Sequence, residues 1–570
     1  MKARLTFLTR YILFWLFAFT IFRLAFMLYQ FNLTVQVTCS DFFTILVRGI
    51  WMDASLTGYI ILLSSVSLAF LIAAGKKTLT RYFGTLTAIL LSVFSLIFIS
   101  DFELYKNWGF RIDSTPLLYL KTPREAMASV EIYMIVIFIV AAVLAVLGFF
   151  WIYKKWVEKT LNNVEPAKWK FAIVMLFIAG LMVLPIRGGL GVAPMNPGKV
   201  YFSQNVYSNH AALNAVWNMM YSVSKSGRMN KRYPDYIEES KAQQLFSEMM
   251  KCQGDPTKVL RSDRPNIVLI LMESFSSVLI EPLGGKSGVT PRFNELTDEG
   301  ILFTKVDASG DRSDKGIIAV LSGFPAQPTM AVIKYPTKSR KLPAISKKLA
   351  DAGYRTTFYY GGDPDFANIR SFLYSAKFQR IVTQDNFPRN LRNAKWGVHD
   401  EYVFNYLLND IDTAKGPFFK MFFTLSSHEP FDIPSTPKFP SNERVDKFLS
   451  SAYYTDSCIG NFFDEAKKRD WYKNTLFILI ADHGHRYLGD GHNYSAEKFA
   501  IPMLWLGGEL NCEPFKVNKN CSQIDLPATL LSQLNLSDSS FVLSRDVLSP
   551  EAQPFAYYAF NNGYGFITQT

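Results

Sequence analysis

Long apolar runs in the first 187 residues constrain this chain more than any other feature. Five runs each hold roughly the 20 residues that an α-helix needs to cross a hydrocarbon core, and they lie at about 11–30, 55–75, 82–100, 132–153 and 169–186. The first run is too long for a cleaved signal peptide, and no A-x-A-like site follows it. We therefore expect residues 1–187 to form an α-helical transmembrane domain of five spans.

One charge, Arg23, stands inside the first of these runs. A guanidinium at that depth is costly unless it faces other helices or reaches the membrane surface. We expect Arg23 to be packed among helices or to extend to the surface, with contact to a lipid headgroup as the alternative.

The net charge is +12, and the positions of the charged residues along the chain indicate how the spans are oriented. Residues 1–187 hold 18 basic and 9 acidic residues, so the rest of the chain carries only +3. Lys and Arg gather at the N-terminus and in the loops after the second and fourth runs, whereas the alternate loops are mixed or acidic. Because basic loops stay on the cytoplasmic side, we expect a cytoplasmic N-terminus. Five spans then place everything after Arg187 outside the cytoplasm, and the basic total does not indicate a nucleic-acid partner.

Beyond the last run the pattern changes twice. Residues 188–264 are expected to form a connector, in which apolar residues at helical spacing over 205–223 indicate a helix. This helix could lie at the membrane surface or pack on the domain that follows. Residues 265–570 are expected to form an α/β domain with a mostly parallel central sheet, because short apolar strands alternate with helical segments such as 342–352. The strands are expected at 266–272, 354–360, 418–425 and 475–481.

Polar side chains come shortly after three of these strands. Glu273 follows the first, Asp482 and His483 follow the last, and His428 lies just after 418–425. Ligands of open α/β sheets bind beyond the carboxyl ends of the strands. Two carboxylates and an imidazole at one sheet edge make a mixed oxygen and nitrogen site for a divalent metal, although each residue alone could be a cap or a turn residue.

A candidate nucleophile stands at the start of a predicted amphipathic helix. Ser313 follows the turn Gly310-Asp311-Arg312. A hydroxyl at a helix N-terminus lies at the positive end of the helix dipole, and metal coordination lowers its pKa. The alternative is an ordinary N-cap serine.

In this order and spacing, the motifs resemble the lipoteichoic acid synthase family. Its members combine five N-terminal spans with an extracytoplasmic sulfatase-like domain of the alkaline phosphatase superfamily. N-I-V-L-I-L-M-E-S is similar to the family's first metal-binding strand, A-D-H-G-H-R to its Asp-His pair, and G-D-R-S-D-K-G to the segment with its catalytic Thr. The resemblance implies that Glu273, Asp482 and His483 bind the metal, and that Ser313 is both a ligand and the nucleophile. This chain has Ser where the family has its catalytic Thr, and a serine hydroxyl can perform the same displacement at phosphorus.

Two further motifs resemble headgroup-binding parts of the family. S-S-H-E-P-F implies that His428 contacts the substrate, and Y-G-G-D-P-D-F-A-N-I-R implies the same for Asp363, Asn368 and Arg370. His492, in G-D-G-H-N-Y-S, is a candidate phosphate contact from a loop, with an exposed loop histidine as the alternative. The C/S-x-P-x-R pattern of true sulfatases is absent after Ser313, which disfavours sulfate ester hydrolysis.

The resemblance implies a metal-dependent transferase in the bacterial cell (inner) membrane. It would move a phosphoglycerol-type headgroup from a membrane phospholipid, through a covalent Ser313 intermediate, to an extracytoplasmic glycan or lipid acceptor. One divalent metal ion is implied, with Mn²⁺ favoured over Mg²⁺ or Zn²⁺. A phosphoethanolamine transferase or a phosphodiesterase with the same site is one alternative. An inactive sulfatase-like membrane sensor or scaffold is another.

The cysteines agree with an exported domain. Five are too few for a disulfide scaffold. Cys512 and Cys521 lie nine residues apart in an expected loop, so a disulfide between them is a reasonable expectation.

Overall fold

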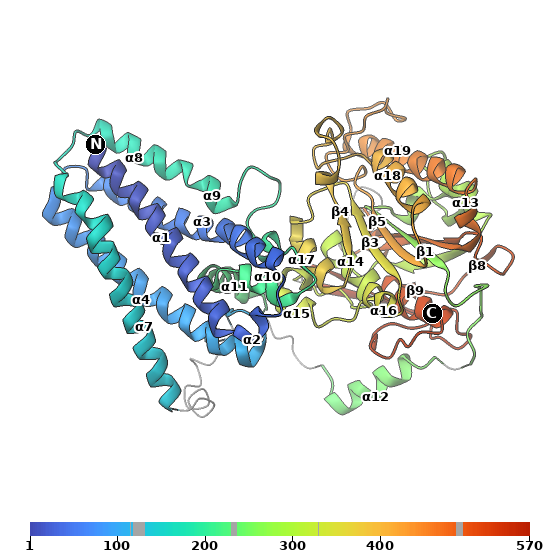
Figure 1. The fold of residues 1–570 in the computed structure, drawn as a ribbon. Coiled ribbons are helices and arrows are strands. Elements are labelled where there is room, and N and C mark those ends of the chain that lie inside the picture. Colours follow the sequence, from blue (N-terminus) through green and yellow to red (C-terminus); the bar gives the residue numbers. More distant parts are fainter. Residues whose placement is uncertain are drawn as a thin grey trace. The chain divides into compact units, whose positions relative to one another are not determined.

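The computed structural model describes residues 1–114, 116–117, 132–229, 236–252, 254–328, 330–485, 494–561 and 563–569. The chain divides into two compact units, Met1–Lys231 and Arg232–Thr570, and Figure 1 shows their elements. The predicted connector 188–264 is divided between these units.

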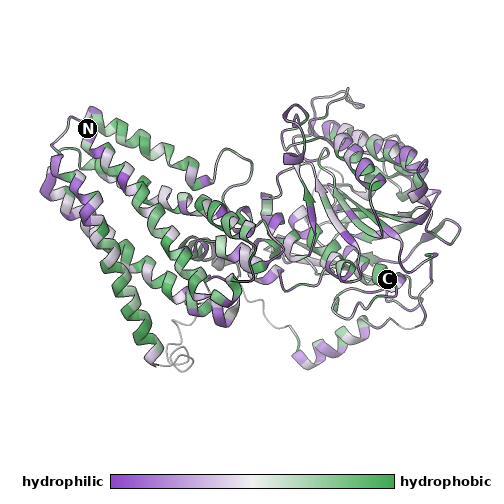
Figure 2. Ribbon diagram, in the orientation of Figure 1, coloured by the Kyte–Doolittle hydropathy of each residue, from purple (hydrophilic) through white to green (hydrophobic). Residues whose placement is uncertain are grey.

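The first unit is a bundle of long helices. Five helices in the described part of the chain are long and apolar enough to cross a membrane, and Figure 2 shows hydrophobic residues along most of α7 and α8. The prediction of a helical transmembrane domain with five spans is confirmed by the length and the apolar composition of these helices. The helices are α1 Lys2–Tyr29, α2 Phe31–Thr34, α3 Cys39–Phe70, α4 Lys76–Trp108, α7 Ile132–Ile152, α8 Lys170–Leu181, α9 Val183–Arg187, α10 Val206–Ala212 and α11 Ala215–Met229.

Arg23 is packed inside this bundle. Its guanidinium donates hydrogen bonds of 2.6 and 2.9 Å to the carboxylate of Asp53 on α3, and both side chains are almost wholly buried. Gly49 leaves the space for it, since a Cβ there would lie 2.2 Å from the Arg23 Cζ. The structure therefore agrees with the packed interpretation of Arg23.

The helix expected over 205–223 is two helices, α10 and α11. Asn214 separates them because its side-chain oxygen accepts a hydrogen bond from the Trp217 backbone N–H, at 3.1 Å, in the first turn of α11. The last carbonyl groups of α10 accept hydrogen bonds of 3.3 Å from Arg23. Both helices pack on α3, and α11 also packs on α4. This segment thus belongs to the first unit.

The second unit is built on one large mixed sheet. Its strand order is β4-β3-β5-β1-β6-β7-β2-β8, with β9 beside β2. Every pairing is parallel except those of β7, which runs antiparallel to both β6 and β2. The expected mostly parallel sheet is confirmed. The strands are β1 Asn266–Met272, β2 Ile301–Asp307, β3 Arg355–Tyr360, β4 Arg380–Val382, β5 Phe418–Phe423, β6 Thr475–Ala481, β7 Ala500–Leu506, β8 Phe515–Val517 and β9 Cys521–Ser522, and a separate hairpin joins β10 Ala556–Phe560 to β11 Gly563–Ile567.

Helices cover both faces of the sheet. In Figure 1, α13, α18 and α19 lie together over one face, and α14 and α16 lie over the other. The central strands β1, β5 and β6 are therefore buried on both faces, which is why β1 and β6 are almost wholly apolar and β5 is apolar except for the buried Lys420. The helices of this unit are α12 Glu239–Met249, α13 Pro291–Thr297, α14 Ser313–Ser322, α15 Pro336–Ser339, α16 Ile345–Asp351, α17 Ile369–Ser375, α18 Asp400–Asp412, α19 Arg444–Ala466 and α20 Leu526–Gln533.

The expected disulfide is not formed. Cys512 and Cys521 are both free thiols. Cys521 is buried in β9, where it pairs with Val306 of β2, whereas Cys512 is exposed in the loop before that strand. The ladder between β2 and β9 holds Cys521 in the core and away from its expected partner.

Candidate active site

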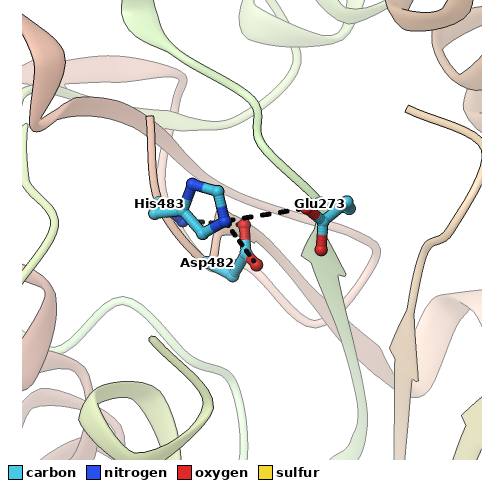
Figure 3. Close-up of side chains that lie close together, drawn as sticks. All are labelled: Glu273, Asp482 and His483. Atoms are coloured by element: carbon cyan, nitrogen blue, oxygen red, sulfur yellow. Dashed lines mark hydrogen bonds and ion pairs between the residues drawn. The ribbon is translucent and has the colours of Figure 1, made fainter. Parts of the chain in front are cut away.

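Three side chains meet where β1 and β6 end. These strands are parallel neighbours, with Met272 opposite Ala481, so Glu273 and Asp482 leave the sheet side by side. His483 follows directly, and its Nε2 lies 3.6 Å from Glu273 Oε1 and 3.4 Å from Asp482 Oδ2 (Figure 3). One ligand atom from each residue fits within 4.8 Å of the others. The structure thus places three of the expected ligands in one cluster.

Hydrogen bonds orient these groups toward one another. The Nδ1 of His483 lies 2.7 Å from the Gly484 carbonyl oxygen, which fixes the ring proton on Nδ1 and leaves Nε2 as the ligand atom. Asp482 Oδ1 accepts the Ser274 backbone N–H at 2.8 Å. Asp482 Oδ2 is buried and accepts no hydrogen bond from the described residues. A buried carboxylate oxygen without a donor is costly unless a cation or a proton satisfies it, so the residues present fit a divalent metal.

Burial of like charges perturbs the acid-base behaviour of the cluster. Burial raises the pKa of Asp482 to about 8, and the nearby charge of Glu273 adds to the rise. Burial alone would lower the pKa of His483, but the two carboxylates outweigh it and raise that pKa. Without a cation the cluster therefore holds additional protons. A divalent cation would take their place.

Ser313 lies at the same cluster. It is the first residue of α14, and Arg312 is the N-cap, so Ser313 is not the ordinary capping residue of this helix. Its Oγ donates a hydrogen bond of 3.0 Å to Glu273 Oε2 and lies 3.5 Å from His483 Nε2. The helix can start this close to β6 because Gly316 has no side chain: a Cβ there would lie 2.2 Å from the Asp482 carbonyl oxygen. Ser313 thus joins the three expected ligands.

The turn after β5 brings His428 to the edge of the cluster. Thr424 Oγ1 accepts the Glu273 backbone N–H at 2.9 Å, and Ser427 Oγ donates to the Glu273 carbonyl oxygen at 2.6 Å. Two hydroxyl groups of this turn therefore hold both peptide groups of Glu273. His428 follows Ser427 directly and is partly exposed, as a substrate contact requires.

The other expected substrate residues lie in the segment after β3. Arg370 is paired with Asp365, with 2.5 Å between Nε and Oδ1, so its charge is already engaged. Asp363 accepts the Asp365 backbone N–H at 2.9 Å and is partly exposed. Asn368 is 1% exposed and donates to the Ile333 carbonyl oxygen at 2.8 Å, so it is held within the protein. His492 lies outside the described residues.

One residue of the site escaped the sequence analysis. Gln523 donates from Nε2 to the carbonyl oxygens of Ala481 and Asp482, at 2.7 and 2.8 Å, and so fixes the end of β6. Its Oε1 accepts the Ser309 backbone N–H, at 3.2 Å, a few residues before Ser313. In the sequence, Gln523 lies in S-Q-I-D-L-P, a stretch that indicates no such role by itself.

Comparisons with known proteins agree with this geometry. The Sulfatase family model matches residues 265–536. A solved protein of the alkaline phosphatase superfamily from Vibrio parahaemolyticus is 31% identical, with a TM-score of 0.53, over 58% of this chain and 84% of that one. The chain belongs to the alkaline phosphatase superfamily.

Curated proteins similar to this superfamily member include lipoteichoic acid synthases. Lipoteichoic acid synthase 2 of Bacillus subtilis (strain 168) is 25% identical over 51% of this chain and 48% of its own length. Lipoteichoic acid synthase of Staphylococcus aureus (strain USA300) is 25% identical over 52% of this chain and 49% of its own length. The chain thus spans about half the length of the curated relatives it matches. The expected resemblance is confirmed, and with the five apolar helices these relatives indicate a multi-pass bacterial membrane protein.

Proposed function

We propose that this chain is a metal-dependent phosphotransferase. It takes a phosphoglycerol-type headgroup from a membrane phospholipid onto Ser313 and passes it to an extracytoplasmic glycan or lipid acceptor. The observation that carries the proposal is the position of the Ser313 Oγ, 3.0 Å from Glu273 Oε2 and 3.5 Å from His483 Nε2. The names of the curated relatives support a phosphotransferase of this kind.

Glu273, Asp482, His483 and Ser313 would hold one divalent cation. Mn²⁺ suits this set best, because carboxylate and hydroxyl oxygens favour Mg²⁺ or Mn²⁺ and the imidazole favours a transition metal, while Zn²⁺ remains the alternative. When bound, the cation supplies Lewis acidity that lowers the pKa of the Ser313 hydroxyl and draws charge from the phosphoryl oxygens.

The residues of the chain then perform two balanced displacements. In the first, a bond forms between Ser313 Oγ and phosphorus, the bond from phosphorus to the diacylglycerol oxygen breaks, and the proton of the serine leaves with diacylglycerol. In the second, a bond forms between the acceptor hydroxyl oxygen and phosphorus, the bond from phosphorus to Ser313 Oγ breaks, and the acceptor's proton passes to Ser313. His428 lies beside Glu273 and would contact the phosphodiester. Arg370 would contribute its charge only in part, because it is shared with Asp365.

The location of the site also belongs to this proposal. The basic loops put the N-terminus in the cytoplasm, and five spans then put the sulfatase-like domain outside, where the outer-leaflet donor and the envelope acceptor lie. The charges of the loops and the location of the proposed substrates therefore both support an extracytoplasmic domain.

Replacement of the nucleophile tests the proposal. With the full chain in mixed micelles of phosphatidylglycerol and at saturating Mn²⁺, Ser313→Ala should reduce diacylglycerol release by at least about a thousandfold, while Glu273, Asp482 and His483 keep the metal bound, as checked by elemental analysis. Ser313→Thr should keep the activity. Ser322→Ala, at the far end of α14 where the buried hydroxyl has no hydrogen-bond partner among the described residues, is the matched control.

Mass analysis of the Ser313 peptide identifies the transferred group. An added phosphoglycerol is the expected result, and an added phosphoethanolamine would reassign the headgroup. Release of diacylglycerol with water as the only acceptor would make the chain a phosphodiesterase. Full turnover by metal-loaded Ser313→Ala would refute the nucleophile, and a metal-free, inactive wild type would favour a scaffold.

A further inference from the structure

The segment Trp396–Asp400, with the sequence W-G-V-H-D, holds the His428 turn at both ends. At one end the Asp400 carboxylate accepts the backbone N–H groups of Leu425 and Ser426, at 2.7 and 3.2 Å. At the other end the Trp396 indole Nε1 donates to the Glu429 carbonyl oxygen at 2.7 Å. Asp400 is fully buried, whereas Trp396 is only partly buried. The Trp396 ring packs against the edge of the hydrophobic core, and its indole N–H donates to the Glu429 carbonyl oxygen, which points to a second role.

The Glu429 carbonyl oxygen has two donors. It lies 2.7 Å from Trp396 Nε1 and 2.8 Å from His428 Nδ1, and a carbonyl oxygen has two lone pairs that can accept both. The two rings also touch edge to face, with 4.5 Å between their centroids and 61° between their planes. Because the carbonyl accepts only from a protonated nitrogen, the His428 proton is held on Nδ1. Nε2 is left as the atom that a substrate can meet.

The imidazole held in this way lies next to the metal-binding cluster. Thr424 and Ser427, in the same turn, bind the backbone N–H and carbonyl of Glu273. A change in the position of the His428 ring would therefore occur within one short turn of a metal ligand. A residue that fixes the position of the His428 ring therefore affects a group at the edge of the proposed reaction site.

We propose that Trp396 is a positioning residue for His428. Its indole N–H anchors the Glu429 carbonyl that fixes the His428 proton on Nδ1, and its ring edge fixes the plane of the imidazole, so that Nε2 faces the headgroup. Nε2 can then accept a hydrogen bond from a headgroup hydroxyl or, when protonated, donate one to a phosphoryl oxygen. Trp396 itself does not touch the substrate. This inference rests on the proposed function for the identity of the headgroup.

A double-mutant cycle in the full chain tests the coupling. Trp396→Phe keeps an aromatic ring and removes the N–H, and it should lower kcat/KM for diacylglycerol release from phosphatidylglycerol by about tenfold, with an unchanged melting temperature. If Trp396 acts through His428, the double variant Trp396→Phe/His428→Ala should be no slower than His428→Ala alone. Trp471→Phe removes an equivalent 2.7 Å indole hydrogen bond, to Asp412 Oδ1 far along the chain, and should leave kcat/KM unchanged.

A binding measurement separates this inference from the proposed function. Calorimetric titration of the Mn²⁺-loaded chain with glycerol phosphate should show weaker binding for Trp396→Phe and for His428→Ala, again without additivity. Non-additive binding in a chain that releases no diacylglycerol would keep the role of Trp396 and refute the transfer. Additive losses in turnover and binding, or an unchanged Trp396→Phe, would refute the role of Trp396 and leave the transfer standing. A wild type with neither activity nor binding would refute both.

Discussion

A single buried carboxylate, Asp482, sets the acid-base character of the metal-binding cluster. Its Oδ2 accepts no hydrogen bond from any described residue, and its neighbour is a second carboxylate. Ionising both carboxylates is therefore unfavourable unless a cation is bound between them. The same arrangement explains why ligand residues are found together at low exposure, with side chains 0%, 3% and 12% exposed for Asp482, Glu273 and His483.

The stability of the metal-free protein should therefore depend on pH. Burial raises the pKa of Asp482 from 3.8 to about 8, and an acid whose pKa is higher in the folded state stabilises that state fully only below its unfolded pKa. We expect the melting temperature in chelator to fall as pH rises from about 4 to about 8. Asp482→Asn should flatten that fall, as measured by differential scanning fluorimetry.

Other buried carboxyl groups also have raised pKa values, so the pH dependence of the wild type must be compared with that of Asp482→Asn. Burial raises the pKa values of Asp307 and Asp456 to about 7, so both add a decline of the same sign. The difference between wild type and Asp482→Asn isolates the metal-binding cluster. Saturating Mn²⁺ should remove most of the fall with pH in the wild type, since the cation keeps Asp482 ionised. An identical pH slope in the two proteins would contradict the assignment.

At the scale of elements, the start of α14 is positioned by a glycine. Gly316 packs on the Asp482 carbonyl oxygen, 2.2 Å from where a Cβ would lie. The helix N-terminus, with its positive dipole end, thus lies against the end of β6. Ser313 and the expected metal ligands come from different elements, and their spacing depends on this one contact.

Gly316→Ala should displace Ser313 without removing any catalytic group. The added methyl group must push α14 away from β6, and we expect the apparent affinity for Mn²⁺ and the turnover each to fall by about ten- to a hundredfold. Gly148→Ala, in a helix where a Cβ meets nothing within 4 Å, should be neutral or slightly stabilising. Wild-type turnover in Gly316→Ala would show that the contact is not needed.

The strands that the sequence predicted are those buried on both faces. Strands β1 and β6 are apolar after their first residue, β5 is apolar except for Lys420, and β3 ends in three aromatic residues. Polar residues follow β1 and β6 directly, which is why Glu273, Asp482 and His483 could be predicted to lie together. The strand β2 was not predicted because exposed Lys305 interrupts it, and β8 has only three residues. The antiparallel direction of β7 depends on the path of the connecting chain, which periodicity does not encode.

The least predictable parts of the site are contacts made through backbone groups. Trp396 and Gln523 act on carbonyl oxygens far away in sequence, and no residue pattern marks such a pair. The substrate contact that the motif implies for Asn368 stays a prediction, and the structure adds that this residue is 1% exposed and donates a hydrogen bond to the Ile333 carbonyl oxygen. Motifs identify residue types, and only the fold decides which atoms they face.

At the scale of the whole molecule, a buried ion pair joins the first span to the second and to α10. Arg23, Asp53 and Asn214 form one network, because Asn214 Nδ2 also donates to Asp53 Oδ1 at 2.9 Å. This network explains why a charge is tolerated in an apolar helix. It also fixes the segment that follows the last span.

Removing one partner of this pair should be costly. Arg23→Ala leaves Asp53 buried and unpaired, and we expect the free energy of unfolding to fall by about 3–5 kcal/mol, measured by thermal unfolding in detergent. The double replacement Arg23→Leu/Asp53→Leu should recover much of that loss. Lys377→Ala, which breaks a half-exposed pair with Asp351, should cost less than about 1 kcal/mol. Equal effects of the two single variants would contradict the buried network.

The proposed orientation can be tested with native thiols. Cys39, Cys252 and Cys512 are exposed, and all three belong to segments expected outside the cytoplasm. In intact cells, or in spheroplasts if an outer membrane is present, an impermeant maleimide should label them. A cysteine introduced as Lys77→Cys in a cysteine-free chain should react only after lysis. Labelling in the opposite pattern would invert the topology.

The parallel pairing of β1 and β6 has a consequence for how this molecule can vary. Side chains alternate between the faces of a strand, so a register shift of one residue would turn every side chain of that strand over. With Met272 opposite Ala481, inserting or deleting one residue in either strand would separate Glu273 from Asp482 even if all ligands were kept. Surface loops tolerate changes in length, whereas the length of each of these two seven-residue strands determines where the carboxylate that follows it lies. Among descendants that keep the chemistry, the lengths of these strands should be as constant as the ligands themselves.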